Sequence, residues 1–447
     1  MKKQMISMAL AGLMVAGLAG CGGGASPSTD SSGAQSQAQS SQGAEAATGD
    51  NTLTVWCWDP AFNIYSMKEA EKFYQKDHPD FKLNVVETPW NDVQTKVITA
   101  ATSGDLSTLP DILLMQDNAF QKNTISYPDA FLDLEGSGIV FEDFAKAKTA
   151  YSVVDGKHYG VPFDNGAAIA AYRTDLLEEA GLTVDDFKDI TWDEYIEKGK
   201  VVLEKTGKPL LSCMSGESDV IMMMIQSAGG SLFDAEGKPD IAGNAIVKEA
   251  METYKKIKDA GVLVEVNDWD QYVSSLTGSN VAGTIQGCWI IGSIRTAEDQ
   301  SGKWAITNIP RFANIDTATN YSNNGGSSWL ITSNTKNKEL AMDFLKSTFG
   351  SNVPFYEDIL PQSGALSTYI PAGQSDIYSQ PQEFFGGQAI YKDITEFAAK
   401  VPSNNTGVYY YEARDAISVA NQKVLQGSPV DAELQVAQDT VEFAMTE

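Results

Sequence analysis

From Leu53 onward, strand-like and helix-like segments alternate, and this alternation restricts the fold more than any other feature. LTVWCW is rich in β-branched and aromatic residues, and residues 64–77 repeat apolar side chains every three or four positions. KLNVVE, a helical pattern over residues 91–104 with Asn91 as the expected N-cap, and PDILLMQ continue the series. Repeated β-α-β units predict an α/β fold with mostly parallel sheets, in which ligands lie beyond the carboxyl ends of the strands.

A second α/β region is predicted in the middle of the chain. It contains a helix over residues 191–207, with Thr191 and Glu194 as a capping box, then the strand PLLSCM and a helix over residues 248–260. The 447 residues are enough for two domains with sizeable cores.

Residues 1–20 are predicted to be a signal peptide, because two lysines precede an apolar run that is too short to span a bilayer comfortably. The run ends in Leu-Ala-Gly-Cys, which looks like a bacterial lipobox with Cys21 as the lipidated residue. The polar, Gly- and Ser-rich segment that follows predicts a flexible tether over residues 21–50. We therefore expect a protein outside the cytoplasm, anchored to the bacterial cell membrane.

The charge and the missing motifs exclude several function classes. With 32 basic against 59 acidic residues, the formal charge of −27 argues against nucleic acid and suits a neutral or cationic ligand. The chain has no phosphate-binding loop, no dinucleotide fingerprint and no zinc motif. We expect no cofactor and no metal, and we interpret Cys57, Cys213 and Cys288 as packing residues. A secreted carbohydrate-active enzyme that uses two acids, such as Asp59 and Glu217, is the alternative to a binding protein.

The segment DGKHYGVPFDNGAAIAAYRTDLLEEAG resembles the extracellular solute-binding proteins of carbohydrate-uptake ABC importers, of the maltose- and multiple-sugar-binding type. The similarity continues through SNVAGTIQGCWIIGSI, GGSSWLITSNTKNKELAMDFLKS and YYYEARDAISVANQKVLQGSPVDAELQVAQ. It implies two lobes, joined by three crossovers around a central ligand cleft. The N-lobe would comprise residues 51–163 and 328–370, and the C-lobe residues 164–327 and 371–447.

The resemblance also implies a function. A monomeric receptor would capture an oligosaccharide and deliver it to a membrane permease whose ATPase is a separate chain. WDPAFNI and SYPDAFLDL are similar to arabino-oligosaccharide-binding members, which favours a pentose-containing or other plant-derived sugar. A binding protein for a polyamine or a peptide is a further alternative.

Sugars are bound by aromatic rings and by planar polar side chains, so such residues at strand ends and crossovers are candidate contacts. Trp58 and Asp59 end the first strand, whereas Trp56 lies one step deeper and is expected in the core. Trp90, after the second strand, is either a ligand contact or a packing residue. Further candidates at a strand end and at the first crossover are Asp117, Asn118, Asp164 and Asn165.

The remaining candidates come from the resemblance. Glu217 lies near a family acid that contacts sugar, and Trp289 aligns with the family's stacking tryptophan. Trp329 either lines the cleft or braces the hinge. At the second crossover the candidates are Asn324, Gly325 and Gly326, where glycine permits close approach of the backbone to a ligand. At the start of a C-terminal helix the candidates are a ring, Tyr410 or Tyr411, and Arg414.

Overall fold

The computed structural model describes residues 51–402 and 406–446, except for the side chain of Ala147. The predictions for the signal peptide, for Cys21 and for most of the tether therefore concern residues outside those described. Among the described residues, no helix combines the length and the apolar character that a membrane span requires.

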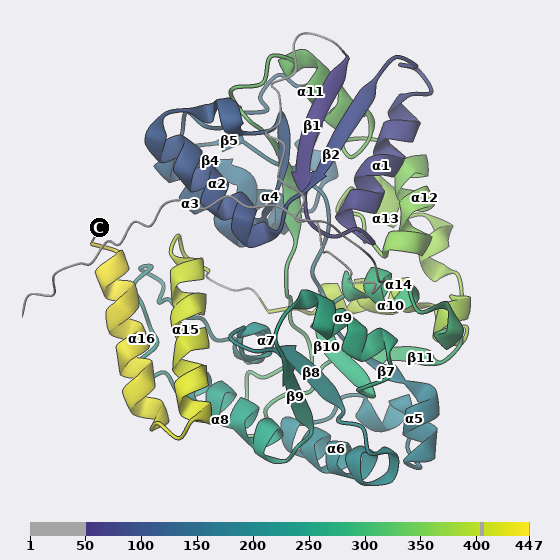
Figure 1. The fold of residues 1–447 in the computed structure, drawn as a ribbon, viewed down its shortest axis with the longest axis vertical. Helices are drawn as coiled ribbons and strands as arrows, with labels where there is room; N and C mark the ends of the chain where they lie inside the picture. Colours follow the sequence, from purple (N-terminus) through teal and green to yellow (C-terminus); the bar gives the residue numbers. More distant parts are fainter. Residues whose placement is uncertain (1–50, 403–405, 447) are drawn as a thin grey trace, which may run out of the picture. The chain divides into compact units, whose positions relative to one another are not determined.

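The N-lobe is built on a five-stranded sheet with the order β2-β1-β3-β12-β6 (Figure 1). Its strands are β1 (Thr52–Cys57), β2 (Lys82–Glu87), β3 (Ile112–Gln116), β6 (Val161–Pro162) and β12 (Ser327–Ile331). β1 pairs in parallel with β2 and β3, as predicted. β12 is antiparallel to both β3 and β6, because the chain returns here from the other lobe.

Alternation along β1 determines which helices cover each face of this sheet. Leu53, Val55 and Cys57 pack into the core that contains α1, α11 and α12, whereas Trp56 faces α2 and α3, as its depth predicted. The helices of this lobe are α1 (Asn63–Tyr74), α2 (Trp90–Ser103), α3 (Asp117–Ser126), α4 (Lys146–Thr149), α11 (Lys338–Ser347), α12 (Val353–Ser363) and α13 (Ile370–Gly373). A short hairpin adds β4 (Val153–Val154) and β5 (Lys157–His158).

The start of α2 corrects one prediction. The N-cap is Pro89, and Asn91 lies inside the first turn. The Pro89 carbonyl accepts hydrogen bonds from the Asp92 and Val93 N–H groups at 2.9 and 3.0 Å, so the helix begins one residue early. By contrast, the capping box of Thr191 and Glu194 is confirmed at the start of α6.

The C-lobe contains a three-stranded sheet, β10-β7-β11, and the pair β8-β9. Its strands are β7 (Ala168–Arg173), β8 (Leu211–Met214), β9 (Leu263–Val266), β10 (Gly283–Gly287) and β11 (Trp304–Thr307). β8 and β9 are parallel, but β7 is antiparallel to both of its neighbours. The N-lobe sheet is therefore mixed and the three-stranded C-lobe sheet is antiparallel. This corrects the prediction of mostly parallel sheets, because hydrophobic periodicity does not encode strand direction.

Helices surround the C-lobe strands on both sides (Figure 1). They are α5 (Thr174–Glu179), α6 (Trp192–Thr206), α7 (Asp219–Ser227), α8 (Ala245–Asp259), α9 (Trp269–Thr277), α10 (Ile290–Arg295), α14 (Ile390–Ala398), α15 (Tyr410–Leu425) and α16 (Val430–Ala444). The helices α15 and α16 pack against each other as an antiparallel hairpin.

Three segments connect the lobes (Figure 1). They run from β6 to β7, from β11 to β12, and from α13 to α14. Bridges pair Asp164 of the first segment with Ser367, just before α13, and Ala167 of the first segment with Asn323 of the second. The exact lobe boundaries stay predictions.

Candidate ligand-binding site

The sixteen predicted contact residues divide into two groups by burial. Five of them are buried: Asp59, Asp117, Asp164, Gly326 and Trp329. The other eleven are half-buried and lie around the seam between the lobes: Trp58, Trp90, Asn118, Asn165, Glu217, Trp289, Asn324, Gly325, Tyr410, Tyr411 and Arg414. Half-buried side chains can exchange a protein or water neighbour for a ligand, so the second group defines the candidate site.

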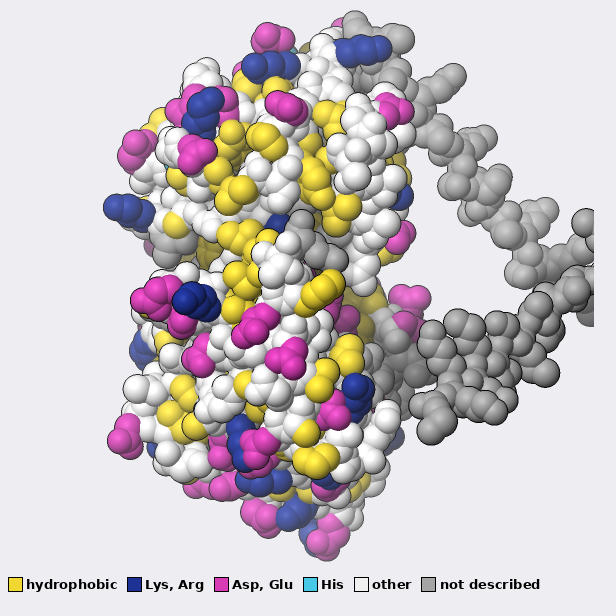
Figure 2. Space-filling model, turned by 90° about the vertical axis from the view of Figure 1, so that its left-hand side faces the viewer, with side chains coloured by type: hydrophobic (Ala, Val, Ile, Leu, Met, Phe, Trp, Pro, Cys, Tyr) yellow, Lys and Arg dark blue, Asp and Glu magenta, His cyan; other side chains and the backbone are white. Residues whose placement is uncertain are grey.

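A run of aromatic rings crosses the seam. Trp58, at the end of β1, lies 5.4 Å from Trp90 between ring centroids, and Trp90 lies 6.0 Å from Tyr411 of α15. Tyr410 continues the run, edge-on to Tyr411 at 5.3 Å. Figure 2 shows hydrophobic side chains where the upper and lower parts of this face meet. Both lobes thus contribute rings to this run.

The first turn of α15 also makes polar contacts with the N-lobe. The Tyr411 hydroxyl donates to Oε1 of Gln116, the last residue of β3. Glu412 forms an ion pair with Lys122 of α3. Tyr410 lies within hydrogen-bonding reach of Asn118. A C-lobe helix is therefore fastened to the carboxyl end of an N-lobe strand.

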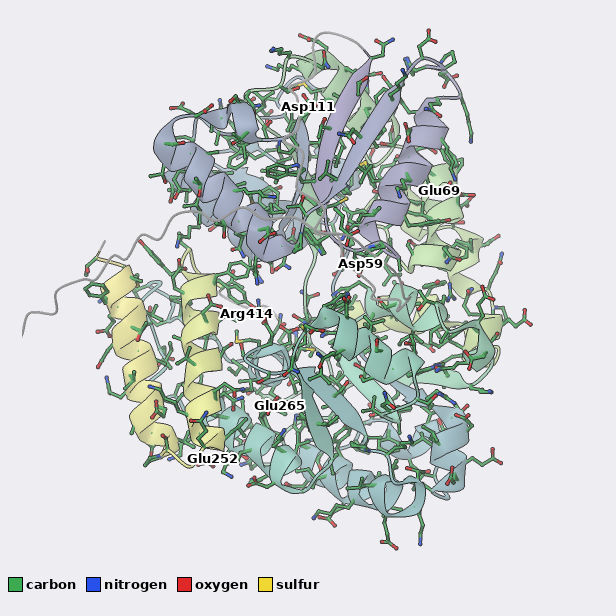
Figure 3. All side chains as sticks on the ribbon, in the orientation of Figure 1. Asp59, Glu69, Asp111, Glu252, Glu265 and Arg414 are labelled. Atoms are coloured by element: carbon green, nitrogen blue, oxygen red, sulfur yellow. The ribbon has the colours of Figure 1, made fainter. Side chains whose placement is uncertain are left out.

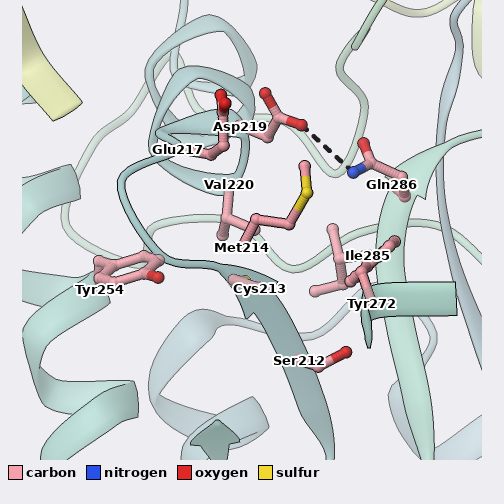
Figure 4. Close-up of a pocket in the computed structure, with 10 residues that line it drawn as sticks. All are labelled: Ser212, Cys213, Met214, Glu217, Asp219, Val220, Tyr254, Tyr272, Ile285 and Gln286. Carbon is pink, nitrogen blue, oxygen red and sulfur yellow. Dashed lines mark hydrogen bonds between the residues drawn. The ribbon is translucent and has the colours of Figure 1, made fainter. Parts of the chain in front are cut away.

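Arg414, one turn further along α15, faces its own lobe. Its Nη2 donates to Oδ1 of Asp219 at 2.8 Å and to Oε2 of Glu217. Burial raises the pKa of Glu217, and Arg414 opposes this shift. Figure 3 places Arg414 on the side of α15 that faces the other C-lobe elements, and Figure 4 shows the Glu217 and Asp219 carboxylates together at the rim of a pocket.

Trp289 lies where the two lobes meet the second crossover. Its Nε1 donates to the carbonyl oxygen of Asn324 at 2.8 Å, and its ring contacts the apolar cores of both lobes. The Trp269 ring lies 5.7 Å away. The neighbouring residue, Cys288, contacts the first crossover, because its Sγ lies 3.1 Å from the carbonyl oxygen of Asn165.

Comparison with known proteins identifies the family. Residues 69–352 match the family described as bacterial extracellular solute-binding protein. The chain belongs to this family. Over 387 residues it is 38% identical to a lactose-binding protein of Rhizobium radiobacter, which covers 87% of this chain and 91% of that protein. An arabinooligosaccharide-binding protein of Halalkalibacterium halodurans is 23% identical over 416 residues, covering 89% of this chain and 90% of that protein.

Two solved structures support the fold of this solute-binding protein. An ABC-transporter-associated binding protein from B. animalis subsp. lactis, in complex with β-1,6-galactobiose, matches with a TM-score of 0.75 and 21% identity, over 88% of this chain and 97% of that one. The GacH receptor of Streptomyces glaucescens matches with a TM-score of 0.74 and 18% identity, over 88% and 97%. These similarities establish the two-lobed α/β fold, and the proteins named here are binding proteins.

The solute-binding protein uses two of its buried acids to hold the start of β12 in place. Asp117, at the start of α3, forms an ion pair with Lys148 and accepts a hydrogen bond from the Ser328 hydroxyl at 3.1 Å. Asp164 accepts one from the Ser327 backbone N–H at 2.8 Å. Burial raises the pKa of both carboxyls, and that of Asp117 to about 6. Since their oxygens are engaged within the protein, we leave both acids out of the proposed ligand contacts.

Asp59 has a local role as well. Its Oδ1 accepts hydrogen bonds from the backbone N–H groups of Ala61 and Phe62 at 2.9 and 3.0 Å, which shapes the turn between β1 and α1. Burial raises the pKa of this carboxyl. Asp59 therefore also leaves the proposed contacts, whereas its neighbour Trp58 stays.

Trp329 and the two glycines correct the prediction more directly. Trp329 is 0% exposed and packs between the rings of Phe163 and Phe349, at 5.4 and 5.3 Å, so it is a core residue of β12. Gly326 has a φ of +102°, and a Cβ there would lie 2.5 Å from the Asp117 carboxylate. At Gly325 a Cβ would lie 2.9 Å from the Trp289 indole nitrogen. At both glycines the missing side chain leaves room for the protein's own Asp117 and Trp289 side chains.

Sequence reasoning missed several polar residues of this site: Gln116, Lys122, Lys148, Asp219, Gln286 and Glu412. Gln116 and Asp219 lie within a few residues of strand ends, the same signal that identified Asp117 and Glu217. The ion pairs of Lys122 and Lys148 join elements far apart in the chain, so no local signal indicates them. No group of three or more potential metal ligands occurs among residues 51–402 and 406–446.

Proposed function

We propose that this protein is the solute-capturing component of an ABC importer for oligosaccharides. The observation that carries the proposal is the aromatic run Trp58–Trp90–Tyr411–Tyr410, which draws on both lobes and is flanked by Arg414 and its acids. Aromatic faces suit the C–H faces of sugar rings, and planar polar groups suit their hydroxyls. A ligand that contacts both lobes stabilises the closed arrangement, which a permease can then recognise.

The relatives rank the sugars to be tested. The lactose-binding relative is the more similar of the two compared above, and one matched structure holds a galactobiose. Galactosides are therefore our first candidates, ahead of the arabino-oligosaccharides that the sequence favoured.

Titration calorimetry on the mature chain tests the proposal, with lactose, β-1,6-galactobiose, arabinotriose, spermidine and a tripeptide as probes. We expect saturable heat with at least one sugar and none with the amine or the peptide. Chromatography after long incubation should return the sugar uncut, because the proposal assigns no catalysis to this chain. Cleavage products would favour the enzyme alternative, and binding of spermidine or the peptide alone would refute an oligosaccharide receptor.

Substitution of single rings tests the site itself. Trp90→Ala and Trp289→Ala should each weaken sugar binding about tenfold or more, equivalent to about 1.4 kcal/mol. Phe443→Ala is the control, because this ring on α16 is 65% exposed and lies outside the candidate site. If both tryptophan variants kept the wild-type affinity, the seam would not be the binding site.

The proposal includes the lipid anchor at Cys21 and the separate permease and ATPase chains. Mass spectrometry of the protein from membranes should show an N-terminal Cys21 that carries acyl chains. Cys21→Ser should appear in the soluble extracytoplasmic fraction with unchanged sugar affinity. The protein should elute as a monomer, and a membrane-bound Cys21→Ser protein would contradict the anchor.

A further inference from the structure

Arg414 is surrounded by more negative charge than it carries. It donates to Asp219 at 2.8 Å and also to Glu217, and its side chain is 17% exposed. The side chains of Asp219 and Glu217 are 19% and 36% exposed. One guanidinium and two carboxylates give this cluster a net charge of −1, in surroundings that are only partly accessible to water.

Asp219 is also the first member of a hydrogen-bonded chain along the C-lobe side of the seam. Its Oδ2 accepts from Nε2 of Gln286 at 3.3 Å (Figure 4). Oε1 of Gln286 accepts from Nδ2 of Asn324, whose carbonyl oxygen accepts from Trp289 Nε1 at 2.8 Å. Asp219 thus holds both Arg414 and Gln286, whereas the Glu217 carboxylate pairs with Arg414.

The other two cations described above at the seam are also neutralised. Lys122 forms an ion pair with Glu412, and Lys148 forms one with Asp117. An anionic ligand that reached Arg414 would have to displace a carboxylate or lie beside two of them. Like charges at such distances repel strongly where water is largely excluded, and the displaced acid would lose its partner. A neutral sugar meets no such repulsion, because its hydroxyls can donate to the same carboxylate oxygens.

We propose that the doubly paired Arg414 makes this site select neutral oligosaccharides against acidic ones, with Asp219 as the residue that sets the selectivity. This inference rests on the proposed function, because it assigns a ligand class to the same seam. Asp219→Asn keeps the shape of the side chain and removes one of the two charges. The cluster of Arg414 and Glu217 then becomes neutral, and an acidic sugar is no longer repelled by an excess carboxylate.

The test compares sugars that differ in one group. The probes are lactose and β-1,6-galactobiose, each beside the derivative whose non-reducing galactose carries a carboxylate at C6. For the wild type we expect binding of a neutral sugar and at least about 100-fold weaker binding of its acid. Asp219→Asn should reduce that ratio to about tenfold or less. Glu217→Gln, at the more exposed acid, should move the ratio in the same direction if Asp219→Asn does not fold.

Asp431→Asn is the matched control. It removes one negative charge from an exposed residue of α16 whose partner is Lys248, within the same lobe. The neutral-to-acid ratio should stay at the wild-type value in this variant, since only the total charge changes.

The outcomes separate the two proposals. If the affinities of the wild type for a neutral sugar and for its acid differ by less than threefold, the proposed selectivity is overturned. The proposed sugar-binding function is then unaffected. The selectivity is also overturned if Asp219→Asn folds but keeps the wild-type ratio of neutral to acidic sugar affinity. It is overturned as well if Asp431→Asn changes that ratio as much as Asp219→Asn does. If neither neutral sugar nor acid binds, and arabinotriose also gives no heat, the proposed function fails and the selectivity fails with it.

Discussion

Trp90 and Trp329 show how differently one residue type is used at positions that are equally ambiguous in the sequence. Trp90 follows a strand and is predicted as either a ligand contact or a packing residue, whereas Trp329 is predicted either to line the cleft or to brace the hinge. The structure leaves Trp90 half-buried between Trp58 and Tyr411, and it encloses Trp329 completely between Phe163 and Phe349. Exposure decides which ring is available to a sugar.

Trp329→Ala should therefore act on stability. Removal of a fully buried tryptophan leaves a cavity, and we expect the free energy of unfolding to fall by about 3–5 kcal/mol. Urea denaturation followed by circular dichroism measures this loss. Trp90→Ala, at a half-buried ring, should lose much less stability and more sugar affinity. If Trp329→Ala were as stable as the wild type but bound sugar more weakly, Trp329 would be a ligand contact in the cleft and not a core residue.

At this scale, the sequence predicted which side of a strand a residue occupies, but not its distant partners. Its deeper position along the first strand predicted that Trp56 lies in the core, where it is 6% exposed. For Asp117 the strand end was predicted correctly, but Lys148, its partner 31 positions later, was not. Periodicity reports burial, whereas an ion pair between two elements depends on a tertiary arrangement that no local pattern contains.

At the scale of elements, the buried polar cluster that joins α3, α4 and β12 is the least predictable part of the hinge. Lys148 of α4 is paired with Asp117 and also donates to the carbonyl oxygen of Ser327 at 2.8 Å. By contrast, the edge strand β2 was predicted to the residue, and so was its parallel direction relative to β1. The antiparallel direction of β12 was not predicted, because the chain leaves the N-lobe after β6 and re-enters it at β12.

This cluster predicts how stability depends on pH. Burial raises the pKa of Asp117 to about 6, although Lys148 opposes the shift. In the unfolded chain an aspartate titrates near about 3.9, so the folded state binds the proton more tightly. The contribution of the protonated Asp117 carboxyl to the stability of the fold is fully present below about pH 4 and is lost as the pH rises through about 6.

Asp117→Asn cannot titrate, so it should lack this dependence. The stability of the wild type relative to Asp117→Asn should fall between pH 4.5 and pH 7.5, by up to about 3 kcal/mol for a shift of two pKa units. Urea unfolding at several pH values measures the difference, with Asp431→Asn as the surface control. If the free energy of unfolding of the wild type instead rose relative to that of the variant with rising pH, the ion pair with Lys148 would stabilise the charged carboxylate more than burial destabilises it.

For the whole molecule, α15 is an element that links the two lobes away from the three crossovers. Its first turn contacts the N-lobe through Tyr411 and Glu412, and its next residues hold the C-lobe acids through Arg414. The family resemblance predicted a ring and an arginine at this position. It did not predict that the ring's hydroxyl would bind Gln116 of the opposite lobe, because that contact depends on how far the lobes are closed.

Tyr411→Phe should shift the molecule toward a more open arrangement. The variant keeps the ring in the aromatic run but loses the hydrogen bond to Gln116, whose net contribution is about 0.5–1.5 kcal/mol. The closed population should therefore fall about 2- to 13-fold relative to the open one, and sugar affinity should weaken by no more than that factor. Small-angle X-ray scattering should show a larger radius of gyration without sugar and the wild-type value at saturation.

Glu412→Gln should act in the same direction, because the ion pair with Lys122 also joins the lobes. Lys248→Met is its control, since the pair of Lys248 with Asp431 lies within the C-lobe and should leave the radius of gyration unchanged. If Tyr411→Phe and Glu412→Gln both kept the wild-type dimensions and affinity, α15 would not hold the lobes together. Closure would then depend on the three crossovers and the sugar alone.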